Sequence, residues 1–167
     1  PASCDRDALV LQGGGALGAY QAGVYQALHE ADIEPDWVSG VSIGAINSAL
    51  IAGNPRERRL ERLRAFWDRI TDRKIWWFTP EGDIFRQARN ATSSFLTTML
   101  GQPGFFEPRR TNAWLAPAGA TDATSFYDTA PLRETLLELV DFDLINSKKV
   151  HFSVGAVNAL SGNFVYF

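Results

Sequence analysis

The feature that most constrains this 167-residue chain is a glycine cluster between a short apolar run and a helical pattern. Residues 8–12 (ALVLQ) are typical of a buried strand, and the sequence GGGALG follows from Gly13 to Gly18. Apolar residues then recur at helical spacing as far as Ala31. A helix that begins after glycines offers free backbone N–H groups to negative charge. That charge belongs either to a bound phosphate or to an oxyanion that exists only during a reaction.

Gly13, Gly15 and Gly18 satisfy the pattern G-x-G-x-x-G, which binds dinucleotides when it joins a strand to a helix. That site also needs an acidic residue at the end of the second strand, where it holds a ribose hydroxyl. The second strand is expected at residues 36–39 (DWVS), and residues 39–42 (SGVS) contain no carboxylate. A nucleotide-binding domain that uses the Gly13–Gly18 loop therefore stays an alternative, although the acidic residue that would hold the ribose is missing.

A second glycine motif, GVSIG, follows directly and has the form G-x-S-x-G. A nucleophilic serine stands on a sharp turn with its hydroxyl exposed, and the neighbouring glycines let helix and strand approach each other. Ser42 is the candidate nucleophile, with Gly40 and Gly44 as its flanking glycines; the alternative is that Ser42 only caps the next helix. If the two strands are adjacent and parallel, both turns lie at the same edge of one sheet.

The remaining pattern alternates between helices and strands, which indicates an α/β fold with a largely parallel sheet. Beyond the first junction, the expected helices cover residues 43–52, 55–70 and 131–140, and the expected later strands cover 150–157 and 164–167. Between them, residues 71–127 form an irregular segment rich in aromatic side chains. We interpret it as an insertion whose aromatic side chains form a lid, an acyl-chain pocket or an ordinary packed core.

A nucleophilic serine needs a base, and the chain has only two histidines. His29 lies late in the first helix, and His151 opens a later strand. A triad of Ser42, one aspartate (Asp128, Asp141 or Asp143) and His151 is formally possible. The other solution is an aspartate that acts directly as the base.

Two stretches carry a resemblance to a known family: GGGALGAYQAGVYQAL and DWVSGVSIGAINSALIAG. They are similar to the patatin-like phospholipases, and the likeness is close from Leu9 to about Asn54. The resemblance implies a three-layer α/β/α sandwich with a mostly parallel central sheet. It also implies release of fatty acids from lipids by a Ser–Asp dyad, without metal or cofactor. By this resemblance Ser42 is the nucleophile, and the oxyanion hole is formed by Gly13, Gly14 and Gly15. The further motif glycines are Gly18, Gly40 and Gly44.

The sequence departs from the family pattern in two ways. Leu17 stands where many members have Arg or Lys, and no aspartate is followed by glycine, although the family's catalytic aspartate lies in D-G-G or D-G-A. We therefore expect residues 1–167 to be one patatin-like domain truncated at its C-terminus. The catalytic aspartate is then expected beyond Phe167, and the bare fragment is expected to be inactive.

Charge and composition limit the partners. A net charge of −3 gives no basic field for nucleic acid. The single cysteine, Cys4, forms no internal disulfide and fits a cytoplasmic protein, and no apolar run approaches the roughly 20 residues of a membrane span. The basic residues of 56–74 and the sequence IWWF at 75–78 are candidates for peripheral membrane contact. A non-catalytic lipid-binding module is thus a third interpretation, and the oligomeric state stays open.

Overall fold

The structure is a computed structural model that describes residues 6–71, 102–109 and 127–167. The chain divides into two compact units, one formed by Pro1–Trp67 with Leu137–Phe167 and the other by Asp68–Leu136. Most of the segment predicted as an insertion, including IWWF at 75–78, lies outside the described residues. The prediction of one truncated domain with a lid or acyl pocket therefore stays a prediction.

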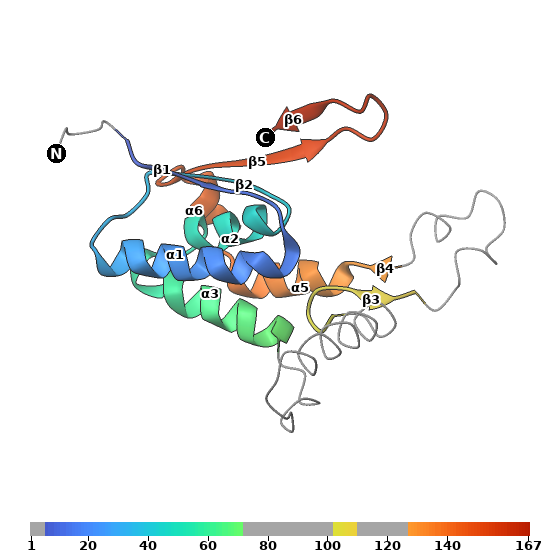
Figure 1. Cartoon of the computed structure of the whole chain (residues 1–167), viewed down its shortest axis with the longest axis horizontal. Coiled ribbons are helices and arrows are strands. Elements are labelled where there is room, and N and C mark those ends of the chain that lie inside the picture. Colours follow the sequence, from blue (N-terminus) through green and yellow to red (C-terminus); the bar gives the residue numbers. More distant parts are fainter. Residues whose placement is uncertain (1–5, 72–101, 110–126) are drawn as a thin grey trace, which may run out of the picture. The chain divides into compact units, whose positions relative to one another are not determined.

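A four-stranded sheet forms the centre of the first unit (Figure 1). Its strands are β1 (Ala8–Leu11), β2 (Trp37–Val41), β5 (His151–Val157) and β6 (Phe164–Tyr166), in the order β1-β2-β5-β6. The first three strands run parallel, and β6 runs antiparallel to β5. Because Leu11 pairs with Gly40 and Gly40 pairs with Val154, the ends of β1 and β2 lie side by side.

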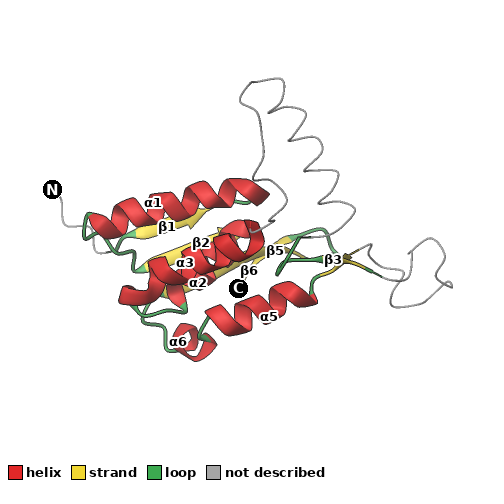
Figure 2. Ribbon diagram, turned by 90° about the horizontal axis from the view of Figure 1, so that it is seen from below, coloured by secondary structure: helices red, strands yellow, loops and turns green. Residues whose placement is uncertain are grey.

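Helices connect the strands, as the alternating pattern predicts. They are α1 (Gly18–Glu30), which follows a short 3-10 turn η1 (Gly15–Leu17), α2 (Ile43–Ala52), α3 (Arg56–Thr71), α5 (Ala130–Leu139) and α6 (Phe142–Asn146). The helix predicted at 43–52 is confirmed with its bounds. In the first unit α2 packs against β1, β2 and β5, and the helices stand in front of the strands when the molecule is seen from below (Figure 2).

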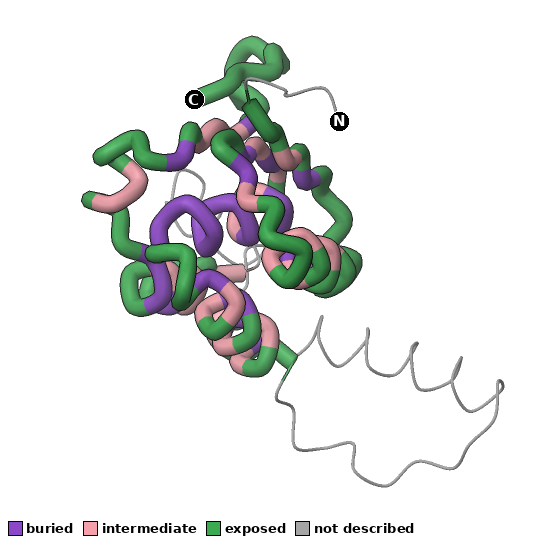
Figure 3. The backbone as a smooth tube through the Cα atoms, turned by 90° about the vertical axis from the view of Figure 1, so that its left-hand side faces the viewer, coloured by how far each residue is buried: buried purple, intermediate pink, exposed green. Residues whose placement is uncertain are grey.

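The core of the first unit lies between the sheet and α2. From Asn47 to Ala52 every residue of α2 is buried, as the tube coloured by burial shows (Figure 3). Val38 on β2 and Tyr25 on α1 are also fully buried. Each large apolar side chain removed from water in this way stabilises the fold by about 1.5–3 kcal/mol, before the entropy of ordering it is subtracted.

The two faces of the sheet differ. Side chains alternate along β2, so Val38 is buried against the helices while Trp37 points to the other face and is 37% exposed. The mixed, mostly parallel sheet with its helices confirms the predicted α/β class and is consistent with the patatin-like α/β/α fold. Among the described residues, the helices of the first unit lie on one face of its sheet (Figure 1).

Residues 158–163 (NALSGN) form the turn that closes the hairpin between β5 and β6. The N–H of Asn158 donates to the carbonyl of Asn163 over 2.9 Å, and Gly162 adopts φ +71°, which glycine tolerates. The antiparallel pairing of β5 with β6 confirms the predicted partner strand.

The described part of the second unit contains a small antiparallel pair, β3 (Glu107–Pro108) with β4 (Tyr127–Asp128). The ring of Tyr127 packs edge-on against Phe106 with 4.9 Å between ring centroids. The Thr135 hydroxyl, in the middle of α5, donates to the carbonyl of Gly104, three residues before β3, over 2.8 Å.

Candidate functional site

The turn after β1 and the turn after β2 lie against each other. A Cβ atom placed on Gly13 would be 3.3 Å from the Ser42 Cβ and 3.5 Å from the Val41 carbonyl oxygen. The glycine loop (residues 13–17) is therefore close to the candidate nucleophile. This closeness follows from the parallel register of β1 and β2 at the carboxyl edge of the sheet, where α/β folds bind their ligands.

Ser42 adopts a backbone conformation that L-residues avoid. Its φ is +55° and its ψ is −124°, and the residue is exposed. A conformation of this kind costs about 1–3 kcal/mol and is typical of functional sites, the serine elbow among them. Ser42 occupies the N-cap position of α2, but its side chain makes no capping hydrogen bond. The alternative in which Ser42 serves only as a helix cap thus loses its main support.

The glycines on either side of Ser42 are required by close backbone contacts. A methyl group on Gly44 would lie 2.0 Å from the Leu11 carbonyl oxygen, and one on Gly40 would lie 2.3 Å from the carbonyl group of Gly44. No side chain fits at these separations, because the obstructing atoms belong to the backbone. The two glycines let α2 begin directly over the end of β1, beside the glycine loop.

The glycine loop itself is exposed from Gly13 to Leu17. Gly15 has a φ of +55°, and no atom lies within 4 Å of the position that a Cβ atom would take. Glycine is therefore favoured here by the backbone conformation and not by a lack of space. Neither Gly13 nor Gly14 donates its backbone N–H to another described residue. These groups are therefore available to an external acceptor at the edge where Ser42 stands.

Gly18 ends the loop and is buried. A Cβ atom there would lie 2.4 Å from Ile43 and 2.8 Å from the ring of Trp67. Because Ile43 directly follows Ser42, the close approach at Gly18 joins the start of α1 to the start of α2. The end of β2 carries Val41 and no acidic residue, so the ribose ligand that a dinucleotide site requires is missing here.

His151 lies far from Ser42. It pairs with Trp37 at the first position of β2, whereas Ser42 follows the last position. Five residues of strand separate the two by about 16 Å. The Trp37 ring packs edge-on against His151, with 4.7 Å between ring centroids. The triad that includes His151 is therefore wrong, because His151 lies at the amino-terminal ends of the parallel strands and Ser42 lies at their carboxyl ends.

His29 contacts Glu34 at the far end of α1. Glu34 also accepts a hydrogen bond from Tyr25 over 2.7 Å and pairs with Arg59 over 2.6 Å. Burial alone would raise the pKa of Glu34, but the hydrogen bonds from Tyr25 and His29 and the charge of Arg59 outweigh it and lower the pKa. Burial also raises the pKa of Tyr25. His29 thus belongs to a cluster that joins α1 to α3.

The aspartates considered for a triad have other places. Asp141 caps α6 by accepting from the Leu144 N–H over 3.0 Å, and its own N–H donates to the Gly53 carbonyl at the C-terminal end of α2. Ser42 stands at the other end of that ten-residue helix, about 15 Å away. Asp143 follows in α6, and Asp128 belongs to the second unit.

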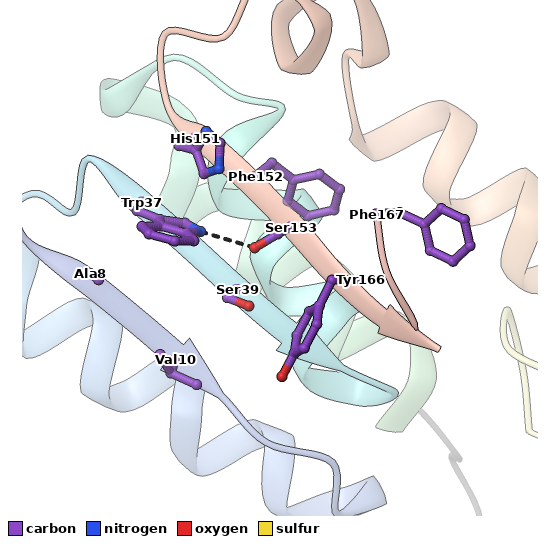
Figure 4. Close-up of a pocket in the computed structure, with 9 residues that line it drawn as sticks. All are labelled: Ala8, Val10, Trp37, Ser39, His151, Phe152, Ser153, Tyr166 and Phe167. Atoms are coloured by element: carbon purple, nitrogen blue, oxygen red, sulfur yellow. Dashed lines mark hydrogen bonds between the residues drawn. The ribbon is translucent and has the colours of Figure 1, made fainter. Parts of the chain in front are cut away.

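A pocket of about 610 Å³ lies on the sheet face opposite α2 (Figure 4). The Trp37 indole N–H donates to the Ser153 hydroxyl over 2.9 Å, and Ser39, His151 and Tyr166 also line the hollow. Neither Ser42 nor the glycine loop belongs to its lining. The pocket is therefore a feature of the sheet face and not of the two turns.

Two polar side chains beside the turns were not predicted from the sequence. Asn47 on α2 is 1% exposed and bonds to Gly18, and Gln21 on α1 bonds to Gln12. The available signal was the position of Asn47 in an otherwise apolar helix, since a buried amide requires partners.

The described residues contain no group of three or more His, Cys, Asp or Glu side chains that could hold a metal ion. Among the helices of residues 6–71, 102–109 and 127–167, none combines the length and the apolar character that a membrane span requires.

Comparison with known proteins gives one family and several partial relatives. The profile of the family described as patatin-like phospholipase matches residues 9–165. The lysophospholipase nte1 of Aspergillus terreus is 59% identical over 44 residues, which are 26% of this chain and 3% of that protein. A putative patatin-like phospholipase domain-containing protein of Caenorhabditis elegans is 43% identical over 65 residues, which are 39% of this chain and 6% of that protein.

A third relative is the neuropathy target esterase sws of Drosophila melanogaster, 57% identical over 42 residues, which are 25% of this chain and 3% of the relative. The chain thus matches only a small part of each of these long relatives. No solved structure gave a significant match. The family profile covers nearly the whole chain, including both glycine turns and the strands that carry them. This chain belongs to the patatin-like phospholipase family.

Proposed function

We propose that the chain carries the nucleophile and the oxyanion hole of a serine-dependent lipid acyl hydrolase. The observation that carries the proposal is the strained, exposed and uncapped Ser42, whose Cβ lies 3.3 Å from the Cβ position of Gly13. Gly13, Gly14 and Gly15 supply backbone N–H groups to the oxyanion. Each such donor is worth about 3–4 kcal/mol of transition-state stabilisation.

In the proposed reaction the Ser42 Oγ attacks the carbonyl carbon of a fatty-acyl ester while a base takes the hydroxyl proton. The carbonyl oxygen becomes an oxyanion beside the glycine loop and the N-terminus of α2. The C–O bond to the alcohol then breaks, and the proton passes to the departing alcohol. Water hydrolyses the acyl-Ser42 intermediate in the same way, which releases the fatty acid and restores the serine.

The proposed base is an aspartate, which forms a Ser–Asp dyad with Ser42. The positions of His29, His151 and Asp141 support this, because none of the three can reach Ser42 in the first unit. No aspartate of the chain is followed by glycine, as it is in the family's D-G-G or D-G-A motif. We place the aspartate in such a motif C-terminal to Phe167, so residues 1–167 alone are expected to turn over little or no ester.

The proposed substrate is a lipid ester. The names of two relatives support this class, since one is a lysophospholipase and another an esterase. The loop between β1 and α1 carries small and apolar residues from Gly13 to Leu17, which bring no competing charge to the ester.

The test is hydrolysis of a fatty-acyl ester by the complete natural polypeptide, its Ser42→Ala variant and its Ser39→Ala variant. Ser39 is the matched control, because it lies on β2, three residues before Ser42, but lines the pocket on the sheet face. We expect Ser42→Ala to lower kcat by at least about 10³-fold and Ser39→Ala to leave it within about twofold.

Two other outcomes would contradict the proposal. Tight binding of NAD or ATP without ester turnover would favour a nucleotide-binding domain that uses the Gly13–Gly18 loop. Lipid binding without turnover by the complete polypeptide would favour a non-catalytic lipid-binding module.

A further inference from the structure

We propose that Asn47 and Gln21 are positioning residues that hold the glycine loop (residues 13–17) against Ser42, an inference that rests on the proposed function. Neither side chain contacts the reacting atoms. Both act through the backbone on either side of the loop.

Asn47 is the centre of the arrangement. Its Nδ2 donates to the Gly18 carbonyl over 2.9 Å and to the Gln21 Oε1 over 3.0 Å, and its Oδ1 accepts from the Trp67 indole N–H over 3.1 Å. The Trp67 indole only donates and the Gly18 carbonyl only accepts, so a single orientation of the amide satisfies both. The side chain is 1% exposed, and its rotation is therefore fixed by three partners.

Gln21 extends this arrangement to the start of the loop. Its Nε2 donates to the Gln12 carbonyl over 2.7 Å, and Gln12 directly precedes Gly13. The backbone is thus held at Gln12, through Gln21, and at Gly18, by Asn47 itself. Asn47 lies on α2, five residues after Ser42. Both ends of the loop are therefore connected by hydrogen bonds to the helix that positions the nucleophile.

The loop needs external anchors because its own residues offer few. Three successive glycines have no side chain to pack, and glycine has the largest conformational freedom of all residues. Donors in an oxyanion hole act only when they are already oriented toward the position of the developing charge. Two anchored ends restrict the N–H groups of Gly13 to Gly15 before substrate arrives.

Gln21→Met is the variant that tests this, since methionine keeps the length of the side chain and removes both hydrogen bonds. The matched control is Gln26→Met on the same helix. Gln26 is also half-buried and hydrogen-bonded, but its partners are Glu30 and Arg64. Asn47→Ala is less suitable alone, because it leaves buried groups without partners and can prevent folding.

The experiment measures kcat and KM for a fatty-acyl ester, and the NMR order parameters of the backbone amides of residues 13–17, in the complete natural polypeptide. We expect Gln21→Met to lower kcat about 10- to 100-fold with KM within about twofold, because the loop contributes only in the transition state. We expect lower order parameters in the loop for Gln21→Met, and we expect Gln26→Met to change neither the kinetic constants nor the order parameters.

Unchanged order parameters of the loop in Gln21→Met would overturn the inference whether or not the protein hydrolyses esters. A rise of KM at constant kcat would also overturn it, because that pattern indicates substrate binding rather than positioning of the oxyanion donors. If the order parameters of the loop fall but the unmodified protein hydrolyses no ester, the anchoring role stands and the proposed function fails.

Discussion

The two glycine turns of the first unit use glycine for different physical reasons. Around Ser42 the glycines are required by space, since a Cβ on Gly44 would lie 2.0 Å from a backbone oxygen. In the exposed loop Gly15 has open space, and only its φ of +55° favours glycine. The turn after β2 is therefore a rigid support for one side chain, whereas the turn after β1 presents backbone groups. Glycine is thus required by the lack of space in one turn and by the backbone conformation in the other.

The largest effect that tests this comparison is expected from Gly44→Ala. The new methyl group meets the backbone of Leu11, which cannot move without opening the contact between β1 and α2. We expect the free energy of unfolding to fall by about 3 kcal/mol or more, measured by urea denaturation.

Gly23→Ala is the matched control for Gly44→Ala. Gly23 lies in α1 with nothing within 4 Å of its Cβ position. Alanine favours a helix by about 0.5–1 kcal/mol over glycine, so this variant should be more stable than the parent. Equal losses in the two variants would refute the steric account of the second turn.

A smaller loss is expected from Gly15→Ala. Only the left-handed backbone opposes alanine here, at a cost of about 1–2 kcal/mol in the free energy of unfolding. Asparagine tolerates this conformation better, so Gly15→Asn should lose less in the same denaturation experiment. If Gly15→Asn lost more than Gly15→Ala, space rather than conformation would limit the loop.

Ser42→Gly should change stability in the opposite direction. Glycine adopts φ +55° without strain, and the Ser42 side chain makes no capping bond that would be lost. We expect the free energy of unfolding to rise by about 1 kcal/mol while ester hydrolysis disappears. A loss of stability would mean that the serine side chain supports the turn.

The smallest effect concerns pH. No ionisable side chain occurs in residues 13–18 or 40–44, so the two glycine turns should not themselves make stability depend on pH. In the first unit, Glu34 is the clearest candidate for a side chain whose protonation lowers the free energy of unfolding. The pKa of Glu34 is lower in the folded protein than the ordinary value of a glutamate. Its contribution to stability is therefore present above that ordinary value and is lost as the pH falls through the lowered pKa. Because such partly exposed pairs are screened, we expect a loss of less than about 1 kcal/mol.

Urea denaturation at pH 6 and pH 3.5 measures this loss, with Glu34→Gln as the comparison. The variant should lose less stability between the two pH values than the parent does. An identical loss in both proteins would show that other carboxylates determine the acid sensitivity.

Sequence periodicity predicted most of the first unit. The helix at 43–52 and the strand-to-helix turns at both glycine motifs follow from local pattern, because α2 is almost continuously apolar and each turn carries its own glycines. The second strand runs to Val41 and not to Ser39 as predicted. Gly40 suggested a turn, but its backbone stays in register with Leu11 and Val154.

Other features depend on tertiary contacts that no local pattern contains. The five-residue helix α6 was missed, since it is too short for periodicity and begins only with the Asp141 cap. The partners of Asn47 come from two other helices, α1 and α3, so the sequence indicates a buried amide but does not identify its hydrogen-bond partners.

The central claim is that Ser42 is an activated nucleophile at these two turns, and active-site labelling tests it most directly. The complete natural polypeptide is treated with a fluorophosphonate, digested and analysed by mass spectrometry to locate the modified residue. The account predicts a label on Ser42 that is absent from Ser42→Ala and unchanged in Ser39→Ala. A label on another serine, or labelling that persists in Ser42→Ala, would contradict it.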